Sequence, residues 1–414
     1  IENAANTTTA FATNNMTEWG VALLYYNATR GSSNCTILNN TISLNRTYAN
    51  TFGIYSNSNH ADVPAVGGAA ASSYDGGNNN LKIYGNTISN VNFGIIAAGL
   101  AGVANYSNGL DIGGTSLATG NTISDFGNTG TFSFGYTGTN TTVQGIYVRY
   151  TTNYNVSYNS ITSSNGGTIS GTLRGVYVNN YITAPTGTIT NTINNNDISL
   201  KSAVAAGTIQ GIYVDVNTVN STTTVNVNNN NFKDSGHTVV ASGPIDMIRL
   251  GITSLFPDAV FNVKNNTFTN LSFNTTGSTT LINDQFSLSS TIESNAVMGT
   301  FARTGASGTF WCYLNNGSQT GGTHKIKNNN FSRITLAGTT AFFGIRSTGG
   351  SSAVQAVEVT GNTVSNVNTG SGTAIGIQTG WEKAPSYVNN NIVKDITGTG
   401  IVSGIIIGKS TGVA

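Results

Sequence analysis

The sequence predicts an all-β protein, a right-handed, single-stranded parallel β-helix of about 11–12 coils that runs without interruption through residues 1–414. Two repeated elements and an unusual composition lead to this prediction. Charged residues make up only 8% of the chain, whereas ordinary soluble domains contain about 25%. Glycine occurs 51 times and proline 5 times. Because valine, isoleucine, tyrosine and phenylalanine are abundant, the chain can bury a core and is not expected to be disordered.

The first repeated element is an apolar residue, two further residues, an asparagine, any residue and a second apolar residue. The segment Ile83-Tyr-Gly-Asn86-Thr-Ile88 is an example. The element recurs at intervals of 29–46 residues, a range typical of solenoids in which each repeat forms one coil. Its asparagines are Asn40, Asn86, Asn121, Asn159, Asn196, Asn230, Asn266, Asn295, Asn329, Asn362 and Asn391.

The second repeated element is a glycine followed by isoleucine or valine, as in Gly145-Ile-Tyr-Val-Arg149. The coils around Asn230, Asn266 and Asn295 lack the glycine and keep only the apolar alternation. Both elements alternate with period two and are rich in β-branched residues, which predicts strands. We expect three short strands per coil: one before the asparagine, one after it, and one that carries the glycine. The connection between parallel strands is expected to be right-handed.

The recurring asparagine is predicted to be a turn residue, not a ligand. Asparagine tolerates strained backbone geometry at a sharp turn and can hydrogen-bond to nearby backbone groups. If the coils stack, the asparagine amides form a ladder that satisfies buried turn carbonyls. Phe232, Phe268 and Phe331 follow two residues after such asparagines and are predicted to form a bulky inner layer.

Charge and cysteine content exclude several classes of partner. The chain has 17 basic and 16 acidic residues, a net charge of +1, and no basic cluster, so nucleic acid is not expected as a partner. No apolar run reaches the 18 or so residues of a membrane-spanning helix. No metal or other cofactor is predicted, because the three histidines are far apart and the two cysteines have no metal-site spacing. Cys35 and Cys312 lie about eight coils apart, too far for a disulfide.

The Asn-x-Ile-Ser and Gly-Ile-Tyr patterns resemble the repeats of the right-handed parallel β-helix superfamily. This superfamily includes pectate lyases, polygalacturonases, phage tailspikes and bacterial surface proteins. The charge-poor composition, rich in threonine, asparagine and glycine, is most similar to that of large surface proteins of the Bacteroidetes that are exported by the type IX system. The resemblance implies a secreted or cell-surface location and is specific for the fold, but it says almost nothing about activity.

Catalysis on such a scaffold needs ionisable groups that converge on one face. The sequence has no Asp-Asp pair and no aspartate-rich strand, so no catalytic residue is assigned. The densest group of charges lies in one coil and contains Lys233, Asp234, His237, Asp246 and Arg249. One interpretation makes His237 or Arg249 a base beside Asp215 of the neighbouring coil. The favoured interpretation is a solvated face with weak ion pairs between coils.

Tyr147, Tyr177 and Tyr213 occupy equivalent outward positions in three consecutive coils. Together with Arg149, Asp215 and Arg249 they are the candidate glycan-contacting residues, because an exposed aromatic row can stack on sugar rings. The favoured alternative is that the rings stack only on one another or lie under loops.

A row of threonine and serine follows the ladder asparagines, for example Thr41, Thr87 and Thr122. Such rows resemble ice-binding faces, but Asp197, Asn231 and Ala296 interrupt this one. Ice binding is therefore the least favoured function, since threonine is also a common strand residue.

The sequence thus favours a non-enzymatic structural or adhesive segment of a secreted or cell-surface protein that contacts glycans. The alternative is a polysaccharide lyase or glycoside hydrolase. Ile1 falls midway round a coil, so we expect the chain to be part of a longer one. Its partners would be further segments of that chain, a surface or secretion assembly, and carbohydrate.

Overall fold

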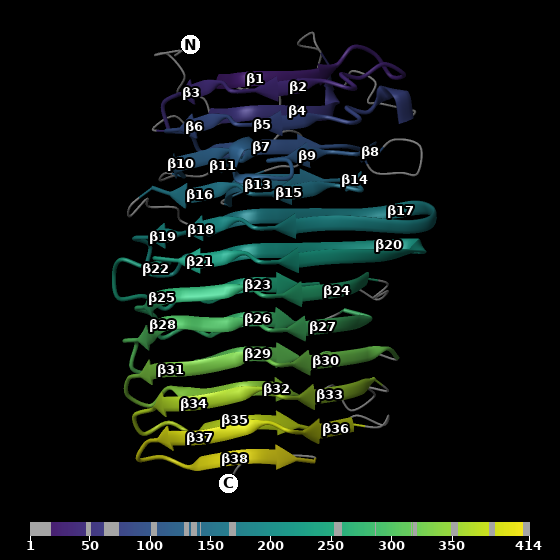
Figure 1. Cartoon of the computed structure of the whole chain (residues 1–414). Coiled ribbons are helices and arrows are strands. Elements are labelled where there is room, and N and C mark those ends of the chain that lie inside the picture. The colour runs from purple at the N-terminus through teal and green to yellow at the C-terminus, as the bar shows by residue number, and fades with distance from the viewer. Residues whose placement is uncertain are drawn as a thin grey trace.

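The structure is a computed structural model of the whole chain. It describes residues 18–46, 51–61, 74–100, 106–127, 132–133, 139–140, 142–164, 171–251, 259–285, 287–315, 317, 321–348, 355–380 and 386–408. The described residues form one stack of coils that extends from β1 to β38 (Figure 1).

Each coil contributes one strand to each of three parallel faces, which we call A, B and C in chain order. Face A contains β1 (Glu18–Tyr25), β4 (Thr51–Ala61), β7 (Phe93–Ala98), β13 (Val143–Arg149), the first parts of β17 (Thr172–Asn194) and β20 (Thr208–Asn228), β23 (Ile245–Leu250), β26 (Thr279–Asp284), β29 (Thr309–Asn315), β32 (Ala341–Ser347), β35 (Ala374–Thr379) and β38 (Val402–Ile407).

Face B follows face A in every coil. It contains β2 (Thr36–Leu38), β5 (Lys82–Tyr84), β9 (Asp111–Ile112), β15 (Asn155–Ser157), the last parts of β17 and β20, β24 (Ala259–Lys264), β27 (Ser289–Glu293), β30 (Thr323–Lys327), β33 (Ala356–Thr360) and β36 (Ser386–Asn389). The long strands β17 and β20 pair along their length and continue from face A into face B, as Figure 1 shows.

Face C completes the coil and is an 11-stranded sheet. It contains β3 (Thr41–Ser43), β6 (Thr87–Ser89), β10 (Thr122–Phe126), β16 (Ser160–Ser163), β18 (Asp197–Ser199), β21 (Asn231–Lys233), β25 (Thr267–Phe273), β28 (Ala296–Arg303), β31 (Asn330–Leu336), β34 (Thr363–Asn368) and β37 (Ile392–Thr397).

Short elements lie at the corners between the faces. They are the strands β8 (Ser107–Asn108), β11 (Phe132–Ser133), β12 (Thr139–Asn140), β14 (Thr151–Thr152), β19 (Lys201–Ser202) and β22 (Gly236–His237), and the 3-10 helices η1 (Tyr74–Gly76) and η2 (Leu117–Thr119). The pairings within faces A, B and C are all parallel, for example β13 with β17 and β25 with β28. The predicted parallel β-helix with three strands per coil is therefore confirmed.

The eleven repeated asparagines form one hydrogen-bonded ladder at the turn between faces B and C. From Asn40 to Asn362, each side-chain amide donates from Nδ2 to Oδ1 of the next asparagine at 2.9–3.0 Å. From Asn86 onward, Nδ2 also donates to a strand carbonyl of the preceding coil at 2.8–3.1 Å. Each amide from Asn86 to Asn362 thus connects three successive coils, and the predicted ladder is confirmed.

The strained backbone at this turn is not on the ladder asparagine, which corrects one detail of the prediction. The residue before it takes the left-handed conformation in ten of the eleven turns, with φ of 53–69°. Eight of these ten residues are asparagine or glycine, at 39, 85, 195, 229, 265, 328, 361 and 390, which adopt this conformation at low cost. Gly120 is the exception, with φ −62°. The ladder asparagine keeps ordinary geometry and uses its side chain for hydrogen bonding.

The glycine of the second repeated element is required by the packing inside the coil. A Cβ atom on Gly94 would lie 2.3 Å from the carbonyl oxygen of Gly145 and 2.7 Å from Cγ2 of Ile123. In the three coils that lack the glycine, the same position holds the buried side chains of Met247, Leu281 and Cys312. The interior of those coils is therefore filled from face A as well as from face C.

The predicted inner layer is also confirmed, because Phe232, Phe268 and Phe331 are all fully buried. The rings of Phe232 and Phe268 stack with centroids 5.4 Å apart. Cys35 and Cys312 are both free thiols, as expected from their separation along the stack. Burial raises the pKa of the Cys312 thiol, which makes this cysteine a core residue and not a nucleophile.

Candidate functional site

The outer surface of face A carries the candidate glycan-contacting residues. Its side chains form three columns that run along the stack, each defined by strand register. The first column is Gln144, Arg174, Gln210, Asp246, Thr280, Trp311 and Phe343. The second column is Tyr147, Tyr177, Tyr213, Arg249, Asn283, Leu314, Arg346 and Gln378. The third column is Arg149, Asn179 and Asp215.

The three tyrosines of the second column stack directly on one another. The ring centroids of Tyr147 and Tyr177 lie 5.1 Å apart, and so do those of Tyr177 and Tyr213. Tyr147 and Tyr213 are each only 6% exposed. The predicted equivalence of the three positions is confirmed, and the rings meet each other as the favoured alternative expected. Both faces of the Tyr177 ring and one face each of the Tyr147 and Tyr213 rings are therefore occupied by neighbouring rings.

Arg174, a residue of the first column, packs against two of these tyrosine rings. Its guanidinium carbon lies 4.0 Å from the ring centroid of Tyr177 and 5.0 Å from that of Tyr213, a cation–π arrangement. Its Nε donates to Oε1 of Gln210 at 2.6 Å. Arg174 was not predicted from the sequence as a member of this group. The signal that could have found it is its position directly before Gly175, which is an outward position in every coil.

Asp215 is an acidic group of this face whose pKa is raised by burial. Burial raises its pKa to about 7, although the cations Arg174 and Arg249 oppose the shift. Its Oδ1 is buried and has no hydrogen-bond partner. Arg149, the other charged member of the third column, folds over Tyr150 at 4.5 Å and donates to the hydroxyl of that tyrosine at 3.0 Å.

Arg249 continues the second column beyond the tyrosines. It lies 5.4 Å from the ring centroid of Tyr213 and pairs with Asp246 at 3.1 Å. Asn283 of the next coil also donates to Asp246, at 3.2 Å. The tyrosine row is thus continuous with a polar region formed by β23, β26, β29 and β32.

This polar region surrounds a cavity of about 320 Å³. Its walls include Asp246, Arg249, Asn283, Trp311, Leu314 and Arg346. Trp311 and Arg346 were not singled out from the sequence, because the outward positions of the repeat have no fixed residue type. A volume near 300 Å³ is at the lower end of the range of small-molecule sites.

The charged coil singled out in the sequence divides into two separate places. Lys233 pairs with Asp197 at 3.1 Å and Asp234 pairs with Lys201 at 2.7 Å, both beside face C. His237 is buried, and its Nε2 lies 2.8 Å from the carbonyl oxygen of Gly207. Burial lowers the pKa of His237, so it is held neutral. In the described part of the chain, no hydrogen bond or ion pair joins His237 to Asp215.

A second ionisable cluster, missed in the sequence, lies inside the coil where face A turns into face B. Asp284 accepts hydrogen bonds from Ser287, from Ser290 at 2.6 Å and from Tyr313 at 3.2 Å. Nδ1 of His324 lies 2.9 Å from Oγ of Ser290 and 3.4 Å from Oδ2 of Asp284. These residues are all buried, so the group resembles a catalytic set only in composition and has no open access for a substrate.

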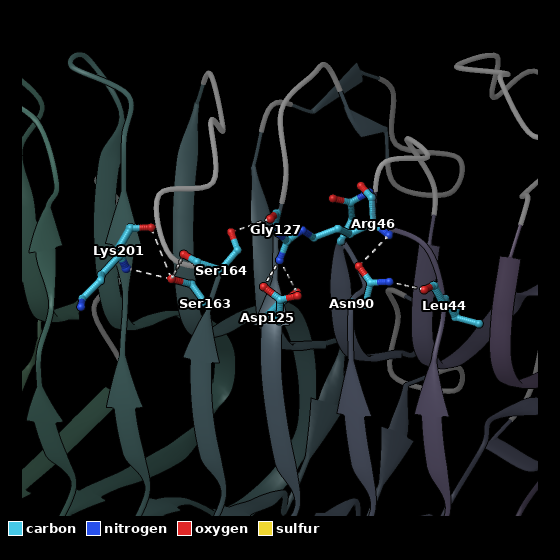
Figure 2. Close-up of polar contacts among 9 residues, drawn as sticks. Leu44, Arg46, Asn90, Asp125, Gly127, Ser163, Ser164 and Lys201 are labelled. Carbon is cyan, nitrogen blue, oxygen red and sulfur yellow. Dashed lines mark hydrogen bonds and ion pairs between the residues drawn. The ribbon is translucent and has the colours of Figure 1, made fainter.

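The corner after face C carries polar contacts between coils in the first half of the stack (Figure 2). Arg46 forms an ion pair with Asp125, which belongs to a coil two steps further along. Asn90 donates from Nδ2 to the carbonyl oxygen of Leu44 at 2.5 Å, and Ser164 donates to that of Gly127 at 2.8 Å. Each contact joins different coils, which indicates a structural role.

The threonine row of face C has the predicted register from Thr41 through Thr87 and Thr122. The ion pair of Lys233 with Asp197 crosses this surface in the middle of the stack. In the regions that the structure describes, no group of three or more histidine, cysteine or acidic residues could hold a metal ion. The same regions contain no helix long and apolar enough to cross a membrane.

Comparison with known proteins gives no match to a family model, to a curated protein or to a solved structure.

Proposed function

We propose that this chain is a rigid, non-enzymatic adhesive segment that binds saccharides on the outer surface of face A. The observation that carries the proposal is a set of buried polar atoms without hydrogen-bond partners on this one surface. They belong to seven side chains: Arg149, Asp215, Arg249, Asn283, Trp311, Arg346 and Gln378. Buried polar groups in folded proteins are almost always hydrogen-bonded. A saccharide supplies hydroxyl groups that donate to and accept from such atoms.

The shape of the surface supports the same proposal. The polar atoms follow the long axis of the stack over many coils, and an extended oligosaccharide has the matching shape. The tyrosines contribute rigid walls, because Tyr147, Tyr177 and Tyr213 are held by mutual stacking. A prearranged surface of this kind loses little conformational entropy when it binds.

A glycan array tests this proposal. We expect the intact chain to bind at least one class of saccharide, and Arg249→Gln to lose most of that binding, since Arg249 lies on face A at the cavity. Lys233→Gln is the matched control, because Lys233 is an exposed cation of face C. Absence of binding to any saccharide, or an equal loss in the two variants, would contradict the proposal.

A secreted or cell-surface location is part of the proposal, with export by the type IX system as its specific form. The resemblance of the repeats to bacterial surface proteins and the low charge of the chain support it. Uncharged hydroxyl and amide side chains cover much of the exterior, and such a surface remains hydrated at varied pH and salt.

A second candidate function, a polysaccharide lyase or glycoside hydrolase, is favoured by one observation on Asp215. Its pKa of about 7 would leave a large fraction protonated at neutral pH, as a general acid requires. If this function is correct, the chain releases new chain ends from a bound polysaccharide. The rate should fall as the pH rises through about 7, and Asp215→Asn should abolish it. Reducing-end and ultraviolet assays between pH 5 and 9 provide the test, and no product at any pH would contradict it.

A further inference from the structure

We propose that the cavity on face A is a subsite for an anionic saccharide, in which Arg346 pairs with a carboxylate or sulfate group and Trp311 supports the sugar ring. This inference depends on the proposed saccharide-binding role of face A and adds the chemical class of the ligand.

The charge of the cavity indicates an anion. Three ionisable side chains line it, and two of them, Asp246 and Arg249, neutralise each other at 3.1 Å. Arg346 has no ion pair with any described residue, and its Nε is buried without a hydrogen-bond partner. One positive charge therefore remains without a counterion in the cavity. An arginine guanidinium favours carboxylate and sulfate oxygens, which it can bind with two parallel hydrogen bonds.

The position of Arg346 is fixed before any ligand binds. Its guanidinium carbon lies 4.7 Å from the ring centroid of Phe343 on the same strand. Burial lowers the pKa of Arg346, and no ion pair with a described residue offsets the cost of withdrawing this cation from water. An anion bound at the guanidinium would compensate that cost.

Trp311 supplies a flat apolar surface beside the charge. One side of its indole stacks on Phe343 of the next coil, with centroids 6.2 Å apart and planes 17° apart. On the other side its register partner is Thr280, which has a small side chain. The second ring face therefore borders the cavity, where the C–H groups of a sugar ring can pack on it. Indole Nε1 is buried without a partner and can donate to a sugar hydroxyl.

The remaining unpartnered atoms of the cavity fit neutral sugar hydroxyls. Oδ1 of Asn283 is an acceptor, and Nε of Arg249 is a donor. Arg249 and Arg346 are three coils apart in the second column, a distance of about 14 Å along the stack. The cavity thus offers an anion position at one end and hydroxyl positions toward the other, which suits an oligosaccharide and not a single small anion.

The test is isothermal titration of the intact chain with three probes of equal length: an oligomer that contains glucuronic acid, a sulfated neutral oligomer, and the unmodified neutral oligomer. We expect one of the two anionic probes to bind at least about tenfold more tightly than the neutral probe. That preference should decrease as the salt concentration rises. The better anionic probe identifies whether carboxylate or sulfate is the recognised group.

Variants locate the site. Arg346→Gln should remove the preference for the anionic probe and leave affinity for the neutral probe nearly unchanged, whereas Arg346→Lys should retain part of the preference. Trp311→Ala should weaken all three probes. Lys327→Gln, a cation on face B that pairs with Glu358, is the control and should change nothing.

Equal affinity for the three probes would overturn this inference while leaving the saccharide-binding proposal intact. An anionic preference that Arg346→Gln does not alter would also overturn it, because the charge would then act from another place. Thermal unfolding of every variant separates a binding effect from a folding defect. Absence of binding to all probes, together with a negative glycan array, would overturn both proposals.

Discussion

Replacing Asn196 by aspartate in the middle of the ladder is expected to destabilise the protein strongly at neutral pH and much less at acid pH. In the native chain, Nδ2 of Asn196 donates to the carbonyl of Val156 and to Oδ1 of Asn230, both at 2.9 Å. A carboxylate would place a negative charge against these two acceptors. Its protonated form still has a hydrogen to donate, so the folded state raises the pKa of the new carboxyl above its unfolded value of about 3.9.

The direction of the pH dependence follows from that raised pKa. The protonated carboxyl is favoured in the folded state, so the variant is least destabilised relative to the wild type below about pH 4, and the difference grows as the pH rises through the folded pKa. Asn196→Ala lacks this dependence and should cost about 1–3 kcal/mol for each buried group left unsatisfied. Urea unfolding at a series of pH values measures both effects.

Asn40 provides the matched control, because it is the first rung and is exposed. Its side chain donates to Oδ1 of Asn86 at 3.0 Å and to the carbonyl of its own neighbour Leu38. Asn40→Asp is therefore expected to cost only about 1 kcal/mol. If the two aspartate variants had equal stability at neutral pH, the ladder would not be a continuous stabilising element.

The fold was predictable from sequence because stacking places equivalent residues in contact. A ladder asparagine such as Asn196 must match Asn159 and Asn230 to complete its hydrogen bonds, and this requirement makes the pattern visible over 29–46 residue intervals. The inward glycine is visible for the same reason, since a Cβ there meets the next coil. The residues that repeat in the sequence are thus those that contact the neighbouring coils.

The candidate site was only partly predictable, because outward positions are not constrained by stacking. Tyr147, Tyr177 and Tyr213 were found because three consecutive coils carry the same residue. Trp311 is the one tryptophan of its column, and Arg346 lies three coils from Arg249, the other arginine of its column, so no periodicity marks them. The burial of the tyrosine rings also could not be derived, since the sequence does not show that Arg174 covers them.

The interior cluster around Asp284 was hidden for a different reason. Asp284 ends a face A strand, whereas Ser290 and His324 lie on face B strands of two successive coils. The loops between faces A and B vary in length, so spacing alone cannot show which residues meet at that corner. Only the path of the chain brings Asp284 to Ser290 and His324.

Asp284→Ala is expected to be the most destabilising single substitution considered for this chain, at a cost of about 3–5 kcal/mol. The carboxylate is fully buried and is the common acceptor for Ser287, Ser290 and Tyr313, with His324 beside it. Removing it leaves these donors without a partner in the interior, and such groups pay their full desolvation cost. Urea unfolding at pH 7 measures the loss. Asp234→Asn is the control, because the Asp234 side chain is 70% exposed and its ion pair contributes little.

The acid sensitivity of the wild-type protein should depend on the same residue. Burial alone would raise the pKa of Asp284. The hydrogen bond and charge of His324, together with the hydrogen bonds from Ser287 and Ser290, instead lower this pKa below its ordinary value. A carboxyl with a lowered folded pKa stabilises the protein above its unfolded pKa of about 3.9, and this contribution is lost as the pH falls through the folded pKa. Asp284→Asn removes the titrating group, so its free energy of unfolding should fall less steeply between pH 5 and pH 2 than that of the wild type. If the two slopes were equal, Asp284 would not be the charged centre of the cluster, and its partners would be held by packing alone.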